Sequence, residues 1–518
     1  MSSRVFLPKL FTVFRAPPVG TGYSRAQFAR DLVAGVTVGF VALPLALALG
    51  IGSIDPATAE AAGVSPPVAG LVTAIIAGFL ISALGGTRAC IGGPTAAFIV
   101  IVASIAQQHG FAGLGVATML SGVILIFLGV TKMGALIKFI PYPVTTGFTT
   151  GIGVTILTGQ LKDLAGLHTL GAGDASIPPE FLGKLHWYFT HTGTIHWPTL
   201  VTGVVCAAVI FLWPKLGLRR LPGPIVVLVL ATIAAQVFRL PLETIGDRFG
   251  SLPTSLPTPR LPSFDWSKTH ELVVPAFTIA MLAAIESLLC AVVADGMTGT
   301  RHRSNTELIA QGVANFTSPL FGGIPATGAI ARTATNIQAG GRTPIAGIVH
   351  ALTLLAILLL VGKFAALVPL CVLAAVLVVV AWNMSELHRF AFLLRGPRQD
   401  AAVLLCTFLL TVFTDLTIAV GVGVVMAAML FMKRMADLTN IGSLSSESVD
   451  LPADALSDTE RERARPLPGV EVYDINGPFF FGAAYKLRET LDQLGRPPRV
   501  LILNMPNVMA MDATGQYA

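Results

Sequence analysis

Charged residues are scarce in this sequence of 518 residues. Asp, Glu, Lys and Arg together make up 12% of the chain, whereas 53% is hydrophobic. Soluble domains carry about 25% charged residues, so this composition excludes an ordinary soluble protein. The net charge of +6 does not indicate nucleic-acid binding, because loops that follow the positive-inside rule give a membrane protein the same excess.

Motifs of enzymes and metal sites are also missing. The sequence contains no HExxH, no GxSxG and no GxxxxGK[ST], so it predicts neither an enzyme nor an ATP-driven pump, and it requires no cofactor. Histidines are few and are expected in loops. The cysteines have no CxxC spacing and lie in or beside apolar segments, which predicts packing rather than a disulfide framework or a zinc site. They are Cys90, Cys206, Cys290, Cys371 and Cys406.

A secretory signal is lacking as well, because residues 1–30 carry Arg and Lys without an apolar core before a cleavage site. Apolar runs, in contrast, fill the region 31–435, and each is long enough to cross a bilayer as a helix. The sequence predicts an all-α polytopic membrane protein with about fourteen spans. They are expected near 32–52, 67–86, 94–107, 112–131, 144–160, 198–213, 223–238, 273–294, 305–321, 327–339, 343–362, 366–382, 400–414 and 416–433.

Lys and Arg cluster in every second loop, which predicts that both termini are cytoplasmic. The third and tenth spans are short, and each opens with glycine and proline. The third reads "IGGPTAAFIVIV" from Ile91, and the tenth reads "FGGIPATGAIAR" from Phe321. The two copies lie seven spans apart, and this odd offset means that they enter the membrane from opposite sides, as in a seven-plus-seven inverted repeat.

Such broken helices indicate a transporter's binding site near the midplane. We expect residues 94–98 and 327–331 to open two half-helices whose positive ends meet and attract an anion. Arg332 would add its charge on the first turn of the second half-helix. The alternative is a salt bridge from Arg332 to a neighbouring helix.

Glu286 is a carboxylate in the middle of the eighth span. Intramembrane carboxylates mark ion and proton pathways, so Glu286 is the candidate coupling residue, with the proton as its partner. A static ion pair between Glu286 and Arg332 is the alternative interpretation.

Long motifs make the chain resemble the SulP family of sulfate permeases and anion exchangers. They are "DLVAGVTVGFVALPLALALGIG", "GGPTAAF" and "AIESLLCAVVADGMTGTRHRSNTELIAQGVANF". The resemblance implies a uracil-permease-like fold in which a core of spans 1–4 and 8–11 moves against a gate of spans 5–7 and 12–14 by alternating access. The anion-binding positions that it implies are Leu45, Leu49, Thr95, Ala96, Gly328, Ala329, Ile330 and Arg332.

The eighth to tenth spans resemble the DauA-type branch of that family, which implies proton-coupled uptake of a dicarboxylate such as succinate or fumarate. Alternatives are a sulfate or bicarbonate transporter, or an anion channel or exchanger on the same fold. Many sulfate-transporting members carry Gln where this chain has Leu45. Sodium-driven members carry oxygen ligands where Cys290 and Ile330 stand, so a proton is the expected coupling ion.

Residues 436–468 are expected to form a polar linker, and 469–518 resemble the first part of a cytoplasmic STAS domain. The loop "MDATG" carries its Asp-x-Ser/Thr-Gly pattern at Asp512, Thr514 and Gly515, and the chain ends before the helix that this loop should begin. The resemblance implies a bacterial inner-membrane protein, a homodimer and a cytoplasmic partner for the STAS domain.

Overall fold

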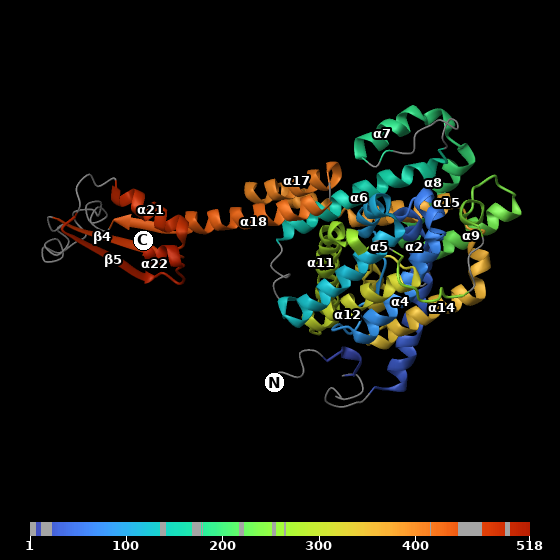
Figure 1. Cartoon of the computed structure of the whole chain (residues 1–518), viewed down its shortest axis with the longest axis horizontal. Coiled ribbons are helices and arrows are strands. Elements are labelled where there is room, and N and C mark those ends of the chain that lie inside the picture. The colour runs from blue at the N-terminus through green and yellow to red at the C-terminus, as the bar shows by residue number, and fades with distance from the viewer. Residues whose placement is uncertain are drawn as a thin grey trace. The chain divides into compact units, whose positions relative to one another are not determined.

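The computed structural model describes residues 7–11, 23–134, 141–167, 178, 180–216, 222–250, 255–263, 266–414, 416–443, 469–492 and 498–518. The chain forms two compact units, Met1–Gly421 and Val422–Ala518 (Figure 1). Most of the expected linker, residues 444–468, lies outside the described residues.

Helices dominate the first unit, and many begin with proline or with a capping side chain. Pro66 opens α4, and Thr343 caps α14 by accepting a hydrogen bond from the backbone N–H of Ile345 at 3.3 Å. The helices are α2 (Arg25–Ser53), α3 (Pro56–Ala62), α4 (Pro66–Leu84), α5 (Phe98–Val130), α6 (Tyr142–Ala165), α7 (Phe181–Thr190), α8 (Trp197–Leu212), α9 (Gly223–Val237), α10 (Ile245–Phe249), α11 (Val273–Thr298), α12 (Ser304–Thr317), α13 (Ile330–Gln338), α14 (Pro344–Ala365), α15 (Leu370–Met384), α16 (Leu387–Leu394) and α17 (Arg398–Phe413). Helix α18 (Leu416–Leu438) begins in the first unit and ends in the second.

Six helical segments of the described chain are long and apolar enough to cross a membrane. They are Arg25–Ser53, Pro66–Leu84, Phe98–Val130, Trp197–Lys215, Thr269–Thr298 and Leu370–Leu394. Gly223–Val237 and Pro344–Leu360 are shorter apolar helices. The first unit is therefore a helical polytopic membrane fold.

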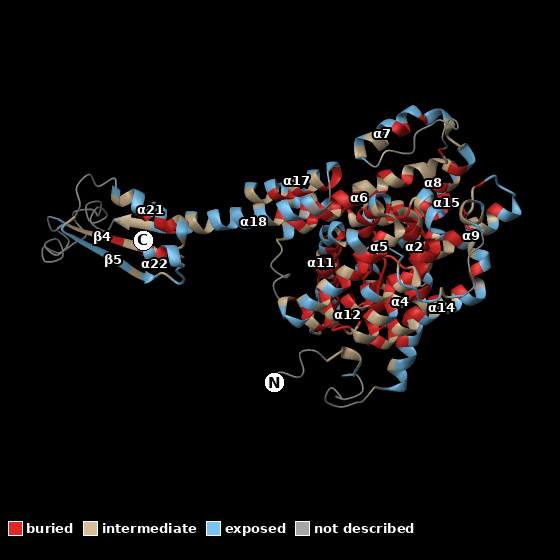
Figure 2. Ribbon diagram, in the orientation of Figure 1, coloured by how far each residue is buried: buried red, intermediate tan, exposed pale blue. Residues whose placement is uncertain are grey.

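The helices of the first unit fall into two packing groups. Helices α2, α4, α5, α11, α12, α13 and α14 contact one another, with α14 lying against both α2 and α4. Helices α6, α8, α9 and α15 form the second group, and α17 joins it through α6. Buried residues are concentrated where the helices meet, and pale exposed faces lie outside them (Figure 2).

Two short strands correct the all-α prediction. Strand β1 (Gly92–Gly93) pairs antiparallel with β2 (Thr327–Gly328), so that Gly92 lies opposite Gly328. The half-helices consequently begin at Phe98 and Ile330, a few residues later than expected. Pairing of the strands provides hydrogen-bond partners for backbone groups that would otherwise lie unsatisfied in an apolar environment. The expected third and fourth spans are continuous in α5 except for a break at Gly110, where φ is 69°.

The second unit contains a small mixed sheet. Strand β4 (Val470–Asn476) lies between β3 (Asn440–Ser443), which is antiparallel to it, and β5 (Val500–Asn507), which is parallel. Helices α21 (Phe481–Asp492) and α22 (Ala513–Tyr517) complete the unit. Its apolar core consists of Ile475, Phe479, Ala483, Ala484 and Leu487.

Candidate functional site

The paired strands β1 and β2, together with the residues that lead from them into α5 and α13, are called the β1–β2 crossing below. Helix α11 contacts this crossing over successive turns. Ala283 accepts a hydrogen bond from the Thr327 hydroxyl at 2.9 Å, and Cys290 donates one from its thiol to Thr333 Oγ1 at 3.1 Å. Between them, Gly328 packs so closely that an added Cβ would lie 3.3 Å from Cα of Ser287. Only glycine fits there without movement of its neighbours. Helix α11 therefore fixes the position of the second broken segment.

The first broken segment is the stretch from β1 to the start of α5, and the second is the stretch from β2 to the start of α13. Glu286 contacts the first of these segments and not the second. Its Oε2 accepts a hydrogen bond from the Thr95 hydroxyl at 2.9 Å, and its side chain is half-buried. No ion pair between described residues joins Glu286 to Arg332, so the static pair considered above is not formed. Among the described residues, the carboxylate of Glu286 is therefore hydrogen-bonded to a neutral hydroxyl and not to a cation.

Arg332 connects the two broken segments. It is the third residue of α13, only 3% of it is exposed, and its Nη2 donates to the carbonyl of Pro94 at 2.8 Å. Its Nη1 is buried and has no hydrogen-bond partner among the described residues. Gly93 makes room for it, because a Cβ at this residue would lie 2.5 Å from Nη1, and the φ of 149° also favours glycine. The salt bridge to a neighbouring helix is likewise not among the described ion pairs.

The first turn of α13 supplies backbone donors, whereas at the start of α5 the N–H groups of Phe98 and Ile99 already donate to the carbonyls of Thr95 and Ala96. The N–H groups of Ile330, Ala331 and Arg332 have no partner within α13, as is general for the first turn of a helix. Ile330 is 42% exposed, so the start of α13 is open on that side. Ala329, which the resemblance implied as a contact, already donates its N–H to the carbonyl of Ile91 at 2.8 Å. That N–H is therefore not free to bind an anion.

The remaining predicted residues lie just before α5 and on α2. Thr95 is half-buried and Ala96 is 6% exposed, just before α5 begins. Leu49, on α2, belongs to the same apolar core as Ala96, and Leu45 packs against that core from one turn earlier. Direct contacts therefore join the predicted positions before α5 with those on α11 and α13, whereas Leu45 and Leu49 are placed only by their membership of the apolar core. Among the described residues, no group of three or more His, Cys, Asp or Glu side chains could hold a metal ion.

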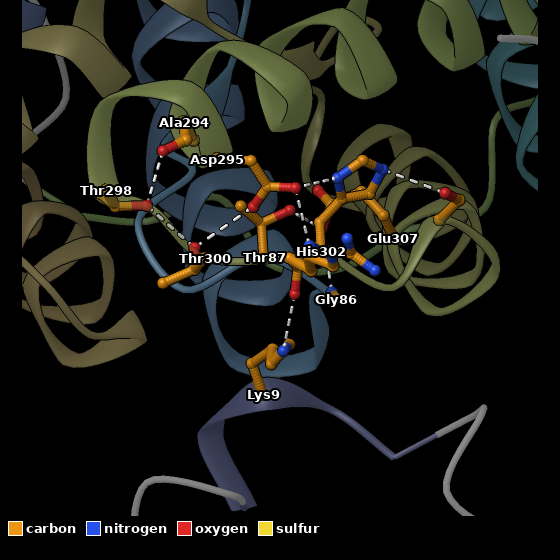
Figure 3. A network of polar contacts seen from close by, with 11 residues as sticks. Lys9, Gly86, Thr87, Ala294, Asp295, Thr298, Thr300, His302 and Glu307 are labelled. Atoms are coloured by element: carbon orange, nitrogen blue, oxygen red, sulfur yellow. Dashed lines mark hydrogen bonds and ion pairs between the residues drawn. The ribbon is translucent and has the colours of Figure 1, made fainter. Parts of the chain in front are cut away.

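A buried carboxylate that the sequence analysis missed is Glu307 on α12. It is fully buried and accepts hydrogen bonds from Gly86 N at 2.9 Å and from Thr87 Oγ1 at 2.8 Å (Figure 3). These contacts fix the loop between α4 and β1. The sequence feature that could have identified Glu307 is its position as the one acidic residue in the otherwise uncharged stretch "SNTELIAQG".

The same network includes the N-terminal segment. Lys9 Nζ donates to the carbonyl of Arg301 at 2.9 Å, and Asp295 accepts from the His302 ring at 2.7 Å (Figure 3). Burial and the nearby cations Arg303 and Arg88 lower the pKa of Lys9. Residues near the start of the chain therefore contact the loop between α11 and α12.

His350 corrects the expectation that the histidines lie in loops. It lies inside α14, is fully buried, and neither ring nitrogen has a hydrogen-bond partner among the described residues. Asp31, which marked only the start of the first span, is also fully buried. It accepts hydrogen bonds from Arg342 N at 2.8 Å and Thr343 Oγ1 at 2.7 Å, so it joins α2 to the start of α14.

In the second unit, Asp512 caps α22. Its carboxylate accepts hydrogen bonds from Gly515 N at 2.7 Å and Phe481 N at 3.1 Å. Thr514 lies within α22, with Asp512 as the capping residue, so the expectation that the chain ends before this helix begins is wrong.

Two broken segments that meet inside a helical polytopic fold define a class of membrane transporters. The chain belongs to the sulfate permease family, whose model matches residues 28–407. It is a secondary anion transporter and not an enzyme.

Two curated relatives illustrate the family. A Bacillus subtilis (strain 168) protein, YvdB, is named as a sulfate transporter and is 39% identical over 96% of this chain and 88% of its own length. The bicarbonate transporter BicA of Synechocystis sp. is 33% identical over 88% of this chain and 78% of its own length.

Solved structures agree with the fold. The transmembrane domain of a cyanobacterial BicA matches with a TM-score of 0.66 at 30% identity, covering 78% of this chain and 97% of that domain. Murine Slc26a9 in the inward-facing state matches with a TM-score of 0.82 at 20% identity, covering 99% of this chain and 86% of that one, which shows the fold alone. The small mixed sheet of the second unit is consistent with a portion of a STAS domain.

Proposed function

We propose that this chain takes up sulfate together with protons, and that bicarbonate is the second candidate substrate. The single observation that carries the proposal is the β1–β2 crossing, where Glu286 and the first turns of two half-helices lie together. Backbone N–H groups and positive helix ends favour an anion. The carboxylate beside them provides a site for the proton.

The names of the relatives favour sulfate or bicarbonate over the dicarboxylate that the DauA-type resemblance implied. Sulfate suits the site for a further reason. Because sulfate carries two negative charges, its electrostatic attraction to the buried cation of Arg332 and to the positive helix ends is stronger than that of a monoanion. Bicarbonate is supported by the 30% identity to the BicA transmembrane domain.

Proton coupling rests on Glu286. Sodium prefers several hard oxygen ligands. Here the thiol of Cys290 is directed to Thr333, and Ile330 offers no side-chain oxygen. A carboxylate with one neutral partner is better suited to bind and release a proton.

Alternating access is supported by the two packing groups. We assign spans 1–4 and 8–11 to a core that carries the site, and spans 5–7 and 12–14 to a gate. The same proposal includes fourteen spans in a seven-plus-seven arrangement and cytoplasmic termini in a bacterial inner membrane. It also includes a homodimer and a cytoplasmic partner of the STAS portion.

The test is uptake by proteoliposomes of labelled sulfate, bicarbonate and succinate, with proton and sodium gradients imposed separately. We expect sulfate to accumulate when only the pH gradient is present. Accumulation driven only by sodium, or of succinate alone, would contradict the proposal. Unitary currents, or rates far above about a thousand ions per second, would instead indicate a channel, because turnovers of about 1 to 1,000 per second are typical of conformational cycles.

A further inference from the structure

Two of the five cysteines contact each other beside the candidate site. The sulfur atoms of Cys90 and Cys290 lie 3.5 Å apart, although 200 residues separate them in the chain. Cys90 directly precedes Ile91 and β1, whereas Cys290 lies on α11, one turn after Glu286. The pair therefore joins the two halves of the expected repeat.

We propose that Cys90 and Cys290 form an oxidation-sensitive dithiol, which a peroxide converts into a disulfide across the candidate site. The sulfur atoms of a disulfide are separated by about 2.05 Å, so they must approach by roughly 1.5 Å. Cys90 belongs to the irregular segment between α4 and α5. Its neighbours are hydrogen-bonded to α13, because Ala89 accepts from Asn336 and Ile91 donates to Thr333, so closing the distance shifts these contacts.

The chemistry is balanced by the peroxide itself. One thiol loses its proton and attacks a peroxide oxygen, which gives a sulfenic acid and one water molecule from hydrogen peroxide. The second thiol attacks the sulfenic sulfur, the S–S bond forms, and a second water molecule leaves. Two thiols are oxidised by two electrons in total, and one hydrogen peroxide is reduced to two waters.

Disulfide formation would alter the hydrogen bonds that hold the crossing. The Cys290 thiol donates to Thr333 Oγ1, which in turn accepts from the N–H of Ile91 at 2.9 Å. The disulfide removes this donor and fixes the segment before β1 to α11. Packing at Gly328 is also close, because an added Cβ there would lie 3.0 Å from the Cys90 sulfur. We therefore expect oxidation to slow transport and a reductant to restore it.

The experiment uses the full chain with Cys206→Ala, Cys371→Ala and Cys406→Ala, so that only the pair remains. Purified protein is treated with hydrogen peroxide, the unreacted thiols are blocked, and a non-reducing digest is analysed by mass spectrometry. We expect a cross-linked peptide that contains Cys90 and Cys290, and we expect a phosphine reductant to remove it. The matched control adds Cys90→Ala to the same background.

Transport is measured on the same samples after reconstitution, each relative to its own untreated rate. Peroxide should inhibit the variant with the pair, reversibly, and should not inhibit the Cys90→Ala control. The transport readout rests on the proposed function, whereas the cross-link does not, so failure of one is distinguishable from failure of the other. Absence of the cross-linked peptide from peroxide-treated folded protein would overturn the proposal, and so would a cross-linked protein that transports at its untreated rate.

Discussion

At the scale of single residues, two ionisable side chains of the candidate site contact consecutive residues just before α5. Glu286 accepts a hydrogen bond from Thr95, and Arg332 donates one to Pro94. The sequence predicted both residues, because ionisable groups are costly in apolar spans and mark function. It could not predict that Arg332 bonds to a backbone carbonyl, because that contact joins residues 238 positions apart.

We predict that Glu286→Gln abolishes coupling to the pH gradient and leaves the fold intact. The amide retains the size of the carboxylate and accepts the Thr95 hydrogen bond, but it cannot bind and release a proton. The measurement is sulfate accumulation in proteoliposomes under a pH gradient alone, with Glu286→Asp as the control that retains a titratable group. A Glu286→Gln protein that still concentrates sulfate under these conditions would rule out Glu286 as the coupling residue.

Arg332→Ala should weaken sulfate binding more than bicarbonate binding, because a dianion interacts more strongly with the lost charge. Loss of a hydrogen bond from a charged group typically costs about 1.5 to 3 kcal/mol, or roughly tenfold to a hundredfold in affinity. Arg332→Lys should restore only part of this, since an ammonium cannot reproduce the guanidinium geometry. Titration calorimetry on the folded variants provides the affinities. If the unmodified chain, Arg332→Ala and Arg332→Lys bound each anion with equal affinity, Arg332 would not contribute to binding. The backbone N–H groups would then be the remaining proposed partners of the anion.

At the scale of elements, the crossing is a pair of strands followed by two half-helices. The Gly-Gly and Pro clusters predicted where the helices are interrupted, because these residues are unfavourable in the interior of a helix. The strand pairing was not predictable, because two-residue strands have no alternating pattern of their own. It arises from a tertiary contact between segments more than 230 residues apart. The hydrogen bonds of Glu307 to Gly86 and Thr87 were not predictable either, because they also join segments far apart in the sequence.

We predict that Gly328→Val disrupts the crossing. A Cβ at this residue would lie 3.0 to 3.3 Å from Cys90, Cys290 and Ser287, so a branched side chain overpacks the site. Overpacking typically costs about 1 to 3 kcal/mol. The melting temperature in detergent and the affinity for sulfate should both fall. Gly159→Ala on α6 is the matched control, because no atom lies within 4 Å of its added Cβ. Equal melting temperatures and affinities for the two variants would contradict this packing.

At the scale of the whole molecule, composition alone identified a membrane protein, and long motifs identified its family. Apolar runs were the basis for the predicted number of spans, whereas the division into core and gate depends on helix packing, which hydropathy cannot show. The unit Met1–Gly421 contains every predicted anion-binding residue, whereas the STAS loop lies in Val422–Ala518. The proposed anion site therefore lies wholly within the first unit.

It follows that deletion of residues after 440 should leave a folded membrane domain that binds sulfate with unchanged affinity. The apolar core of the second unit is a separate cluster of residues, so the first unit does not need it for packing. Size-exclusion chromatography and calorimetry in detergent test this prediction. Aggregation of the shortened chain, with the full chain well behaved in the same detergent, would show that the second unit is required for folding.

The position of a bound anion tests the central claim most directly. Crystals of the full chain grown with selenate, an analogue of sulfate, would locate the anion by the anomalous scattering of selenium. We predict a peak within hydrogen-bond distance of the first-turn N–H groups of α13, on the side of Thr95 and Glu286. The comparison site is a cavity of about 270 Å³ lined by Lys162 and Arg248, in which Arg248 is already ion-paired to Asp163 and Glu243. A selenate peak in that cavity, with none at the β1–β2 crossing, would contradict the assignment of the crossing as the anion site.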